Sequence, residues 1–298
     1  MKQLALDKLM LYCGSVNAME TRVRAWLPGT VENDLQLTGS VLGPHCEFAR
    51  TLPATVPFRP TATSSGIQSV AVVPDPCLWT PELPMLYEVR VELRREGDVV
   101  AAVQRPLAIR KFEPRGRDLN LSGKRWVLRG ARRSNVAPGP LSSWHEAGAA
   151  MLLSDFDEAL ASDAARLGVP LVALTRGTTR EVIAAELRCL ACSPAVVIAA
   201  IDAGADLPDD IGLAAIDIRL AAHSPAQRVP DTLPRWASLL LCESDDAVAI
   251  GRAATDREFP VIALRPAEHA PDIATARAAC DALQRDLAPL ADLAGYIV

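Results

Sequence analysis

The sequence is poor in aromatic residues and has no long apolar run, and both shortages exclude classes of protein. Aromatic side chains make up 4% of the 298 residues, which argues against a sugar-binding cleft lined with aromatic rings. The longest strongly apolar run is 195–201, far short of the ~20 residues that a membrane helix needs. The net charge of -5 and the pI of about 5.5 argue against a general nucleic-acid binder.

Targeting, disulfide and cofactor signals are also missing. The first residues, MKQLALDKLMLYC, lack the apolar core and the small-residue cleavage site of a signal peptide, which predicts a cytoplasmic protein. Seven cysteines, an odd number spread from Cys13 to Cys280, predict free thiols rather than a disulfide framework. No phosphate-binding glycine loop is present and the four histidines lie far apart, so we expect neither a cofactor nor a metal site.

The first part of the chain has the pattern of a β-sandwich. Apolar and polar residues alternate in 35–41, 67–73 and 86–93, as in strands with one buried face. Glu96-Gly97-Asp98 predicts a turn, and 99–109 supplies a partner strand. Prolines separate these runs. Residues 1–112 are therefore predicted to form a sandwich of about immunoglobulin size.

After about residue 125 the pattern changes to strands that alternate with helices, which indicates a parallel sheet, open or closed into a barrel. Helices are expected at 154–167, 178–192, 245–256 and 272–287. The expected strands are 126–129, 169–174, 195–201, 213–218, 238–242, 260–264 and 295–298. These strands are one fewer than the eight of a standard TIM barrel.

One segment is specific enough to suggest a family. It reads PCLWTPELPMLYEVRVEL over 76–93, IRKF over 109–112 and LSGKRWVLRG over 121–130. The order and spacing of these motifs resemble glycoside hydrolase family 2, the β-galactosidase, β-glucuronidase and β-mannosidase group. The resemblance implies an immunoglobulin-like domain with Trp79 and Tyr87 in its core, followed by a hairpin and a catalytic TIM barrel.

The resemblance weakens where the family carries its catalytic residues. The segment 131–134 lacks the histidine of the family's N-R-H motif, and 172–177, matched to the family's second strand, keeps Arg176 but no following histidine. The resemblance places Gly204 at the acid/base glutamate and Arg265 at the nucleophile. A glycosidase of this type needs two carboxylates about 5 Å apart, and arginine is permanently protonated.

These observations predict a multi-domain β + α/β protein. It consists of an immunoglobulin-like sandwich at 1–112, a linker hairpin at 113–124, and a degenerate, incomplete (β/α) TIM-type barrel at 125–298. The leading hypothesis is a glycoside hydrolase family 2-like protein that lacks the standard glutamates and has a carbohydrate-binding or scaffold role. An active β-glycosidase with relocated carboxylates, and a structural protein without a ligand, are the alternatives. An acidic pair in one pocket favours the enzyme, whereas a mouth filled by ion pairs favours the scaffold.

Relocated catalysis has candidates among the acids that follow expected strands, where barrel enzymes place their chemistry. Asp202 with Glu243 is the pair that we consider, with no confident catalytic residue otherwise. Asp206 and Glu268 also follow expected strands. The alternative reading is structural: loop acids are solvated, and Asp245 and Asp246 cap the next helix.

Three arginines, Arg129, Arg176 and Arg265, lie at or beyond expected strand ends. They are candidates for binding an anionic ligand through bidentate contacts. The alternative is that they form ion pairs with Asp202, Glu243 or Glu268. Trp144, in the loop expected after the first barrel strand, is a further ligand-binding candidate or a packing residue.

Two other features favour a structural reading. Ten basic residues lie between Arg105 and Arg133, which we interpret as a solvated domain junction because no aromatic residues are interleaved as in nucleic-acid sites. Cys189 and Cys192 have redox spacing, but we expect them to be buried structural thiols. The expected partners are a carbohydrate, or a protein or second copy that covers the open edges of an incomplete barrel, with no nucleic acid and no membrane.

Overall fold

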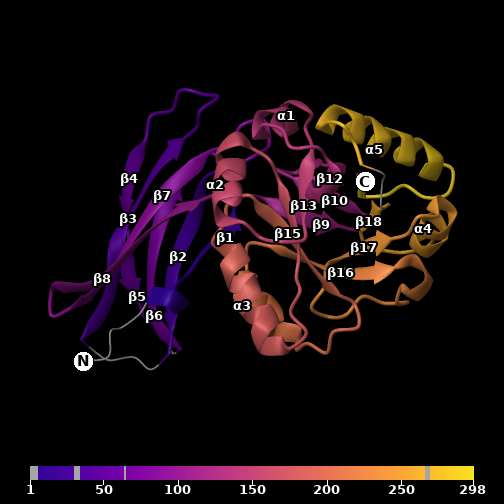
Figure 1. The fold of residues 1–298 in the computed structure, drawn as a ribbon. Coiled ribbons are helices and arrows are strands. Elements are labelled where there is room, and N and C mark those ends of the chain that lie inside the picture. Colours follow the sequence, from indigo (N-terminus) through magenta and orange to yellow (C-terminus); the bar gives the residue numbers. More distant parts are fainter. Residues whose placement is uncertain (1–5, 30–33, 64, 266–268) are drawn as a thin grey trace. The chain divides into compact units, whose positions relative to one another are not determined.

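The structure, a computed structural model, describes residues 6–29, 34–63, 65–265 and 269–298. The chain divides into two compact units. The sandwich unit comprises 1–79 and 83–110, and the barrel unit comprises 80–82 and 111–298. Figure 1 shows the strands of the first in indigo to purple and the helices and strands of the second in magenta to yellow.

The sandwich unit contains two four-stranded antiparallel sheets, in the orders β1-β2-β6-β5 and β4-β3-β7-β8. A short 3-10 helix, Leu6–Lys8, precedes them. The strands are β1 (Met10–Val16), β2 (Glu20–Pro28), β3 (Leu35–His45), β4 (Ala54–Pro57), β5 (Arg59–Thr61), β6 (Gly66–Pro74), β7 (Leu86–Arg95) and β8 (Asp98–Leu107). The alternating runs predicted as strands are confirmed as β3, β6 and β7, and the partner strand predicted at 99–109 is confirmed as β8. The strands β1, β2, β4 and β5 were not predicted.

The core of the sandwich follows from the alternation of these strands. Along β7, Tyr87, Val89, Val91 and Leu93 are buried while the residues between them are more exposed. Tyr87 belongs to the hydrophobic core of the sandwich, as the resemblance implies, and Trp79 is fully buried but is not a member of that core cluster. The turn between β7 and β8 is also confirmed, because Glu96 and Gly97 both have positive φ, 51° and 98°, as a two-residue hairpin of type I′ requires.

The barrel unit begins with a three-stranded antiparallel sheet in the order β11-β10-β9. Its strands are β9 (Phe112–Arg115), β10 (Asp118–Leu121) and β11 (Lys124–Arg125). Phe112 packs edge-on against Trp126, with ring centroids 5.6 Å apart. Arg219 donates from Nε to the Phe112 carbonyl at 3.0 Å, and this bond ties β9 to the barrel strand that begins at that arginine.

The parallel strands form a closed barrel of eight strands in the order β12 to β19, so the expected incomplete barrel is wrong. The strands are β12 (Leu128–Arg132), β13 (Ala150–Leu153), β14 (Leu171–Leu174), β15 (Val196–Asp202), β16 (Arg219–Pro225), β17 (Leu239–Glu243), β18 (Val261–Leu264) and β19 (Gly295–Ile297). Pairing of β19 with both β18 and β12 closes the ring. The expected open edges for a partner therefore do not exist in the barrel.

One omission explains the wrong strand count, and a second strand was placed too early in the sequence. The missed strand is β13, which has four residues, all buried, and therefore carries no alternation. The strand expected at 213–218 is instead the end of a 3-10 helix, Asp209–Ala215, and a short connection. The real strand, β16, follows immediately and begins at a charged residue, Arg219.

Helices surround the barrel, and the predicted ones are confirmed with shorter ends (Figure 1). They are α1 (Leu141–Glu146), α2 (Glu158–Leu167), α3 (Arg180–Ala191), α4 (Ala247–Ala254) and α5 (Ile273–Leu287), with short 3-10 helices at Arg133–Asn135 and Ala226–Arg228. Side chains of Asp157, Thr179, Asp246 and Asp272 cap the first turns of α2 to α5. No helix in the described ranges is both long and apolar enough to cross a membrane.

Candidate functional site

The strand register determines which polar side chains point into the barrel, because paired residues of neighbouring parallel strands face the same side. Asp202 pairs with His223, and His223 pairs with Leu241, two residues before Glu243. Glu243 pairs with Leu264, and the register continues through β19 to β12. Asp202, His223, Glu243 and Arg132 therefore share the inner face near the carboxyl ends of their strands, where barrel enzymes place their sites.

Four side chains form a connected chain at this end of the barrel, which we call the mouth cluster: Arg132, Ser154, His223 and Glu243. Arg132 donates from Nη2 to Glu243 Oε1 at 3.2 Å and from Nη1 to Ser154 Oγ at 3.5 Å. His223 Nε2 lies 2.8 Å from Glu243 Oε2. Both oxygens of the carboxylate are thus engaged, and the side chains of Arg132, His223 and Glu243 are 22%, 23% and 27% exposed.

The mouth contains a second carboxylate, Asp202, in different surroundings. Asp202 ends β15 and is exposed, and its Oδ1 accepts the N–H of Gly204 at 2.8 Å. The structure brings the predicted pair Asp202 and Glu243 to the same end of the barrel, on either side of His223 in β16. Asp202 stabilises its own loop, whereas Glu243 is held by side chains from two other strands.

The two positions matched to the family's glutamates carry no carboxylate. Counting from β12, Gly204 follows the fourth strand and Arg265 follows the seventh. Arg265 lies 3.8 Å from Asp286 of α5. The match of 172–177 to the second strand is wrong, because β14 is the third strand and β13 is the second. This shift moves Arg176 away from the position that the resemblance gave it.

The predicted ligand-binding residues do not converge. Arg129 contacts two residues of α5, Gln284 at 2.7 Å and Asp281 at 3.4 Å. Arg176 pairs with Asp155 in the loop after β13. Trp144 is buried in α1 rather than placed in a loop, so its ring packs inside the fold. None of the three predicted arginines has Asp202 or Glu243 as its ion-pair partner within the described residues, and Glu268 lies outside those residues.

The seven cysteines differ in how far they are buried. All seven cysteines are free thiols, as predicted, but Cys189 on α3 and Cys192 just after it are exposed rather than buried. Burial raises the pKa of the Cys242 thiol to about 12 and that of Cys280 to about 11.

Part of the basic segment 105–133 is neutralised locally, because Arg125 pairs with Asp118 and Asp292, both at 2.7 Å.

Sequence reasoning missed Arg132, Ser154 and His223. Arg132 lies in 131–134, the segment that lacks the histidine of the family motif. It follows Gly130 by two residues on β12, so both residues face the same side of the strand. His223 was hidden because its strand was placed too early in the sequence. Within the described residues, no group of three or more His, Cys, Asp or Glu is arranged to hold a metal ion.

Comparison with known proteins supports the fold. Residues 29–110 match the model of the glycosyl hydrolases family 2, which confirms the resemblance for most of the sandwich. No curated protein matches the chain. Three solved structures with the same fold are a Bacteroides uniformis β-glucuronidase 2 covalently bound to cyclophellitol-6-carboxylate aziridine, a Bacteroides vulgatus β-glycosidase, and an FMN-binding β-glucuronidase from Facaelibacterium prausnitzii L2-6.

These structures are distant in sequence. Their identities to this chain are 16%, 11% and 13%, with TM-scores of 0.63, 0.64 and 0.63. The matches cover 97%, 87% and 98% of this chain but only 45%, 38% and 55% of theirs. The chain thus spans about half the length of proteins whose sandwich and barrel it shares, and at this identity the likeness shows the fold alone.

Proposed function

We propose that this protein is a degenerate glycoside hydrolase family 2-like protein that binds a carbohydrate at the mouth of its barrel without hydrolysing it. The observation that carries the proposal is the pairing of Glu243, whose two oxygens are held by Arg132 and His223. Gly204 and Arg265 follow the strands that carry the family's glutamates, so neither supplies a general acid or a nucleophile.

The chemistry of the mouth cluster suits sugar hydroxyl groups. Arginine has five N–H donors and a carboxylate has about four lone-pair sites, so the printed hydrogen bonds leave donors and acceptors unused. The partial exposure of Arg132, His223 and Glu243 places those groups within reach of a ligand. The structural neighbours named as β-glucuronidases and β-glycosidases support a glycoside as the ligand class.

An active β-glycosidase is the second candidate, and the strand register supports it. Asp202 and Glu243 lie at the same end of the barrel on strands that both pair with β16. In that case Glu243, held by two donors, would act as the nucleophile, and the exposed Asp202 would act as the acid. A structural protein without a ligand is the third candidate. The closed barrel removes the open strand edges that a partner would cover, but the ion-paired mouth is the feature that this role predicts.

The test measures hydrolysis and binding in parallel. Nitrophenyl β-galactoside, β-glucuronide, β-mannoside and β-glucoside are offered to the wild type, to Asp202→Ala and Glu243→Ala, and to Asp206→Ala as an exposed control on the same loop. Binding of the corresponding methyl glycosides is measured by calorimetry on the wild type and on His223→Ala. We expect no turnover, and binding of one sugar that His223→Ala weakens.

Each other result selects another candidate. Turnover that Glu243→Ala and Asp202→Ala abolish, but Asp206→Ala does not, would establish relocated catalysis and refute the proposal. A result with neither turnover nor binding would favour the structural role.

We also propose a cytoplasmic location, which the seven free thiols support because disulfides are rare in that compartment.

A further inference from the structure

A cavity of about 330 Å³ lies in the sandwich unit, far in the sequence from the mouth cluster. Its lining comes from β3, β4, β6 and β7 and from the loops 46–53 and 75–85. Because β6 belongs to one sheet and the other three strands to the second, the cavity lies between the two sheets. The walls are mainly apolar and include Val41, Val56, Val73 and Met85.

The walls are held in place by specific contacts. The hydroxyl of Thr51 donates to the Pro44 carbonyl at 2.6 Å, which fixes the loop between β3 and β4. The N–H of Cys77 donates to the Tyr87 hydroxyl at 2.9 Å. Gly43, with a φ of +155°, leaves room for the Tyr87 ring, because a Cβ there would lie 2.7 Å from Cδ1. The cavity is therefore built into the fold rather than opened by a mobile loop.

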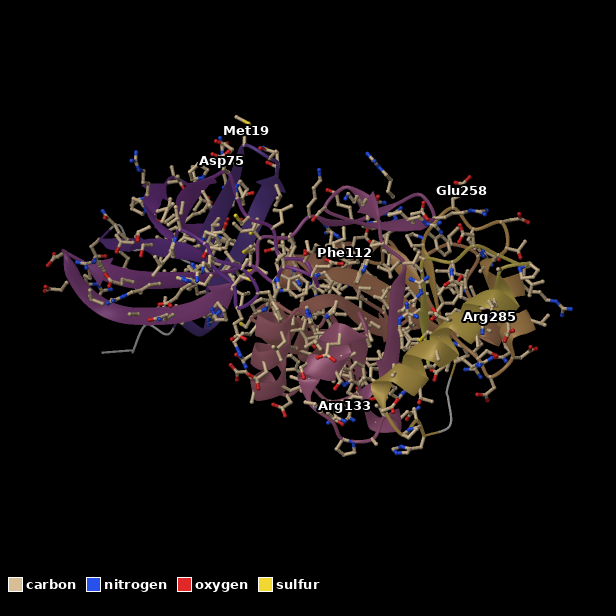
Figure 2. All side chains as sticks on the ribbon, turned by 90° about the horizontal axis from the view of Figure 1, so that it is seen from above. Met19, Asp75, Phe112, Arg133, Glu258 and Arg285 are labelled. Carbon is tan, nitrogen blue, oxygen red and sulfur yellow. The ribbon has the colours of Figure 1, made fainter. Side chains whose placement is uncertain are left out.

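Two charged residues of opposite sign line the cavity; the backbone conformation explains the aspartate at one position, although its carboxylate has no ion-pair partner among the described residues. Asp75 has a positive φ of 42°, which Asp and Asn tolerate better than other residues. Its N–H donates to the Met19 carbonyl at 2.9 Å, and the two residues lie side by side at one end of the sandwich (Figure 2). Arg50 is exposed and has no ion-pair partner among the described residues.

The lining also includes Leu52, whose side chain is 94% exposed. A single exposed leucine needs no explanation, but this one belongs to the wall of an apolar cavity. A ligand that fills the cavity and covers Leu52 would remove apolar surface from water, which is favourable. Arg50, two residues earlier in the same loop, would then lie beside the outer end of the ligand.

We infer that this cavity binds a small carboxylate with a compact apolar body, such as a single ring or a branched chain. The apolar body packs among Val41, Val56, Val73 and Met85, and the carboxylate accepts hydrogen bonds from the Arg50 guanidinium. The volume lies at the small end of ligand pockets, which span roughly 300–1,000 Å³. The site is independent of the barrel mouth and of the function proposed for it.

The test uses three probes that share one ring, namely phenylacetate, phenylacetamide and phenethylamine. Their binding to the full chain is measured by calorimetry and by ligand-observed NMR. Arg50→Gln removes the charge, with Arg59→Gln on β5 as its matched control. Ala54→Phe fills the cavity from an exposed position of β4, and Thr55→Phe adds the same ring at the next residue, which does not line the cavity.

We expect phenylacetate to bind about 5-fold more tightly than phenylacetamide, the factor for one hydrogen-bonded charge pair at an exposed rim. Arg50→Gln should remove that difference, and Ala54→Phe should abolish binding of both, while both controls behave as wild type. Tightest binding of phenethylamine would overturn the assignment of an anionic ligand. No binding of any probe at millimolar concentration, or binding that Ala54→Phe leaves intact, would refute the site. None of these results depends on sugar binding or hydrolysis at the barrel.

Discussion

The strands β6 and β15 differ in how many of their two faces are buried. In β6, the fully buried Ala71 is followed by Val72, which is 44% exposed. In β15, Ile198 and Ala199 are neighbours and both are fully buried. A sandwich strand has one face toward the core, whereas a barrel strand is covered on both faces. The sandwich therefore leaves an alternating pattern in its sequence and the barrel does not.

The largest expected effect is a direct test of this difference. Ala71→Asp should destabilise the sandwich by about 4 kcal/mol or more, because it buries an unpaired charge, while Val72→Asp should cost less than about 1 kcal/mol. In the barrel, both Ile198→Asp and Ala199→Asp should cost about 4 kcal/mol or more. Hydrogen exchange read by mass spectrometry reports each unit separately. Tolerance of Ala199→Asp would show that the outer face of β15 is not covered as described.

A smaller effect is expected for the coupling free energy of an ion pair, which we compare between the two units. A double-mutant cycle on Arg132→Gln and Glu243→Gln should give a coupling free energy of about 1–2 kcal/mol, because the pair is only partly exposed. The same cycle on Arg22 and Glu20, which are 55% and 43% exposed at 3.4 Å, should give a few tenths of a kcal/mol. Urea unfolding of each variant supplies the values. Equal couplings would mean that the mouth cluster is solvated like an ordinary surface.

The smallest effect is a pH dependence that belongs to the barrel. Burial raises the pKa of Cys242 from 9.0 to about 12, so the folded state holds the thiol proton more tightly than the unfolded chain. The resulting stability is complete below about pH 9 and is lost as the pH rises from 9 toward 12.

The matched variant for this effect is Cys242→Val. At about pH 10 it should recover about 1 kcal/mol of barrel stability relative to wild type, after correction for the difference near pH 8. Urea unfolding at both pH values, followed by digestion and peptide mass spectrometry, measures the two units separately. An equal change in the sandwich, or no change in the barrel, would contradict the assignment to Cys242.

The sequence located four of the eight sandwich strands and six of the eight barrel strands among the described residues, so alternation was not the only useful signal. The alternation of 86–93 located β7 and its turn, and the resemblance placed Tyr87 correctly in the core. The four-residue strand β13, buried throughout, gave no periodic signal. The strand β16 was placed too early because it opens on Arg219 and contains His223. In the folded unit these side chains bond to the Phe112 carbonyl of β9 and to Glu243 of β17.

The candidate site was predictable only in part. Asp202 and Glu243 follow strands, and that position alone placed them at the correct end of the barrel. Arg132 and His223 reach Glu243 from β12 and β16, and these contacts depend on the register around the whole ring. Because β13 was missed, 172–177 was matched to the family's second barrel strand, whereas the strand there, β14, is the third. Arg176 was therefore assigned to the wrong strand.

The closing strand of the barrel also sets an order for folding during synthesis. Arg132 donates its N–H to the Val298 carbonyl at 2.7 Å, and Val298 donates to the Gly130 carbonyl at 3.1 Å. The barrel ring therefore stays open until residue 298 has left the ribosome. The sandwich has all its strands by Leu107 and is able to fold while the barrel is still being made, since domains generally fold as units in that order. Throughout that interval the edge of β12 that pairs with β19 in the complete barrel is exposed, and an exposed strand edge is a template for pairing with another chain.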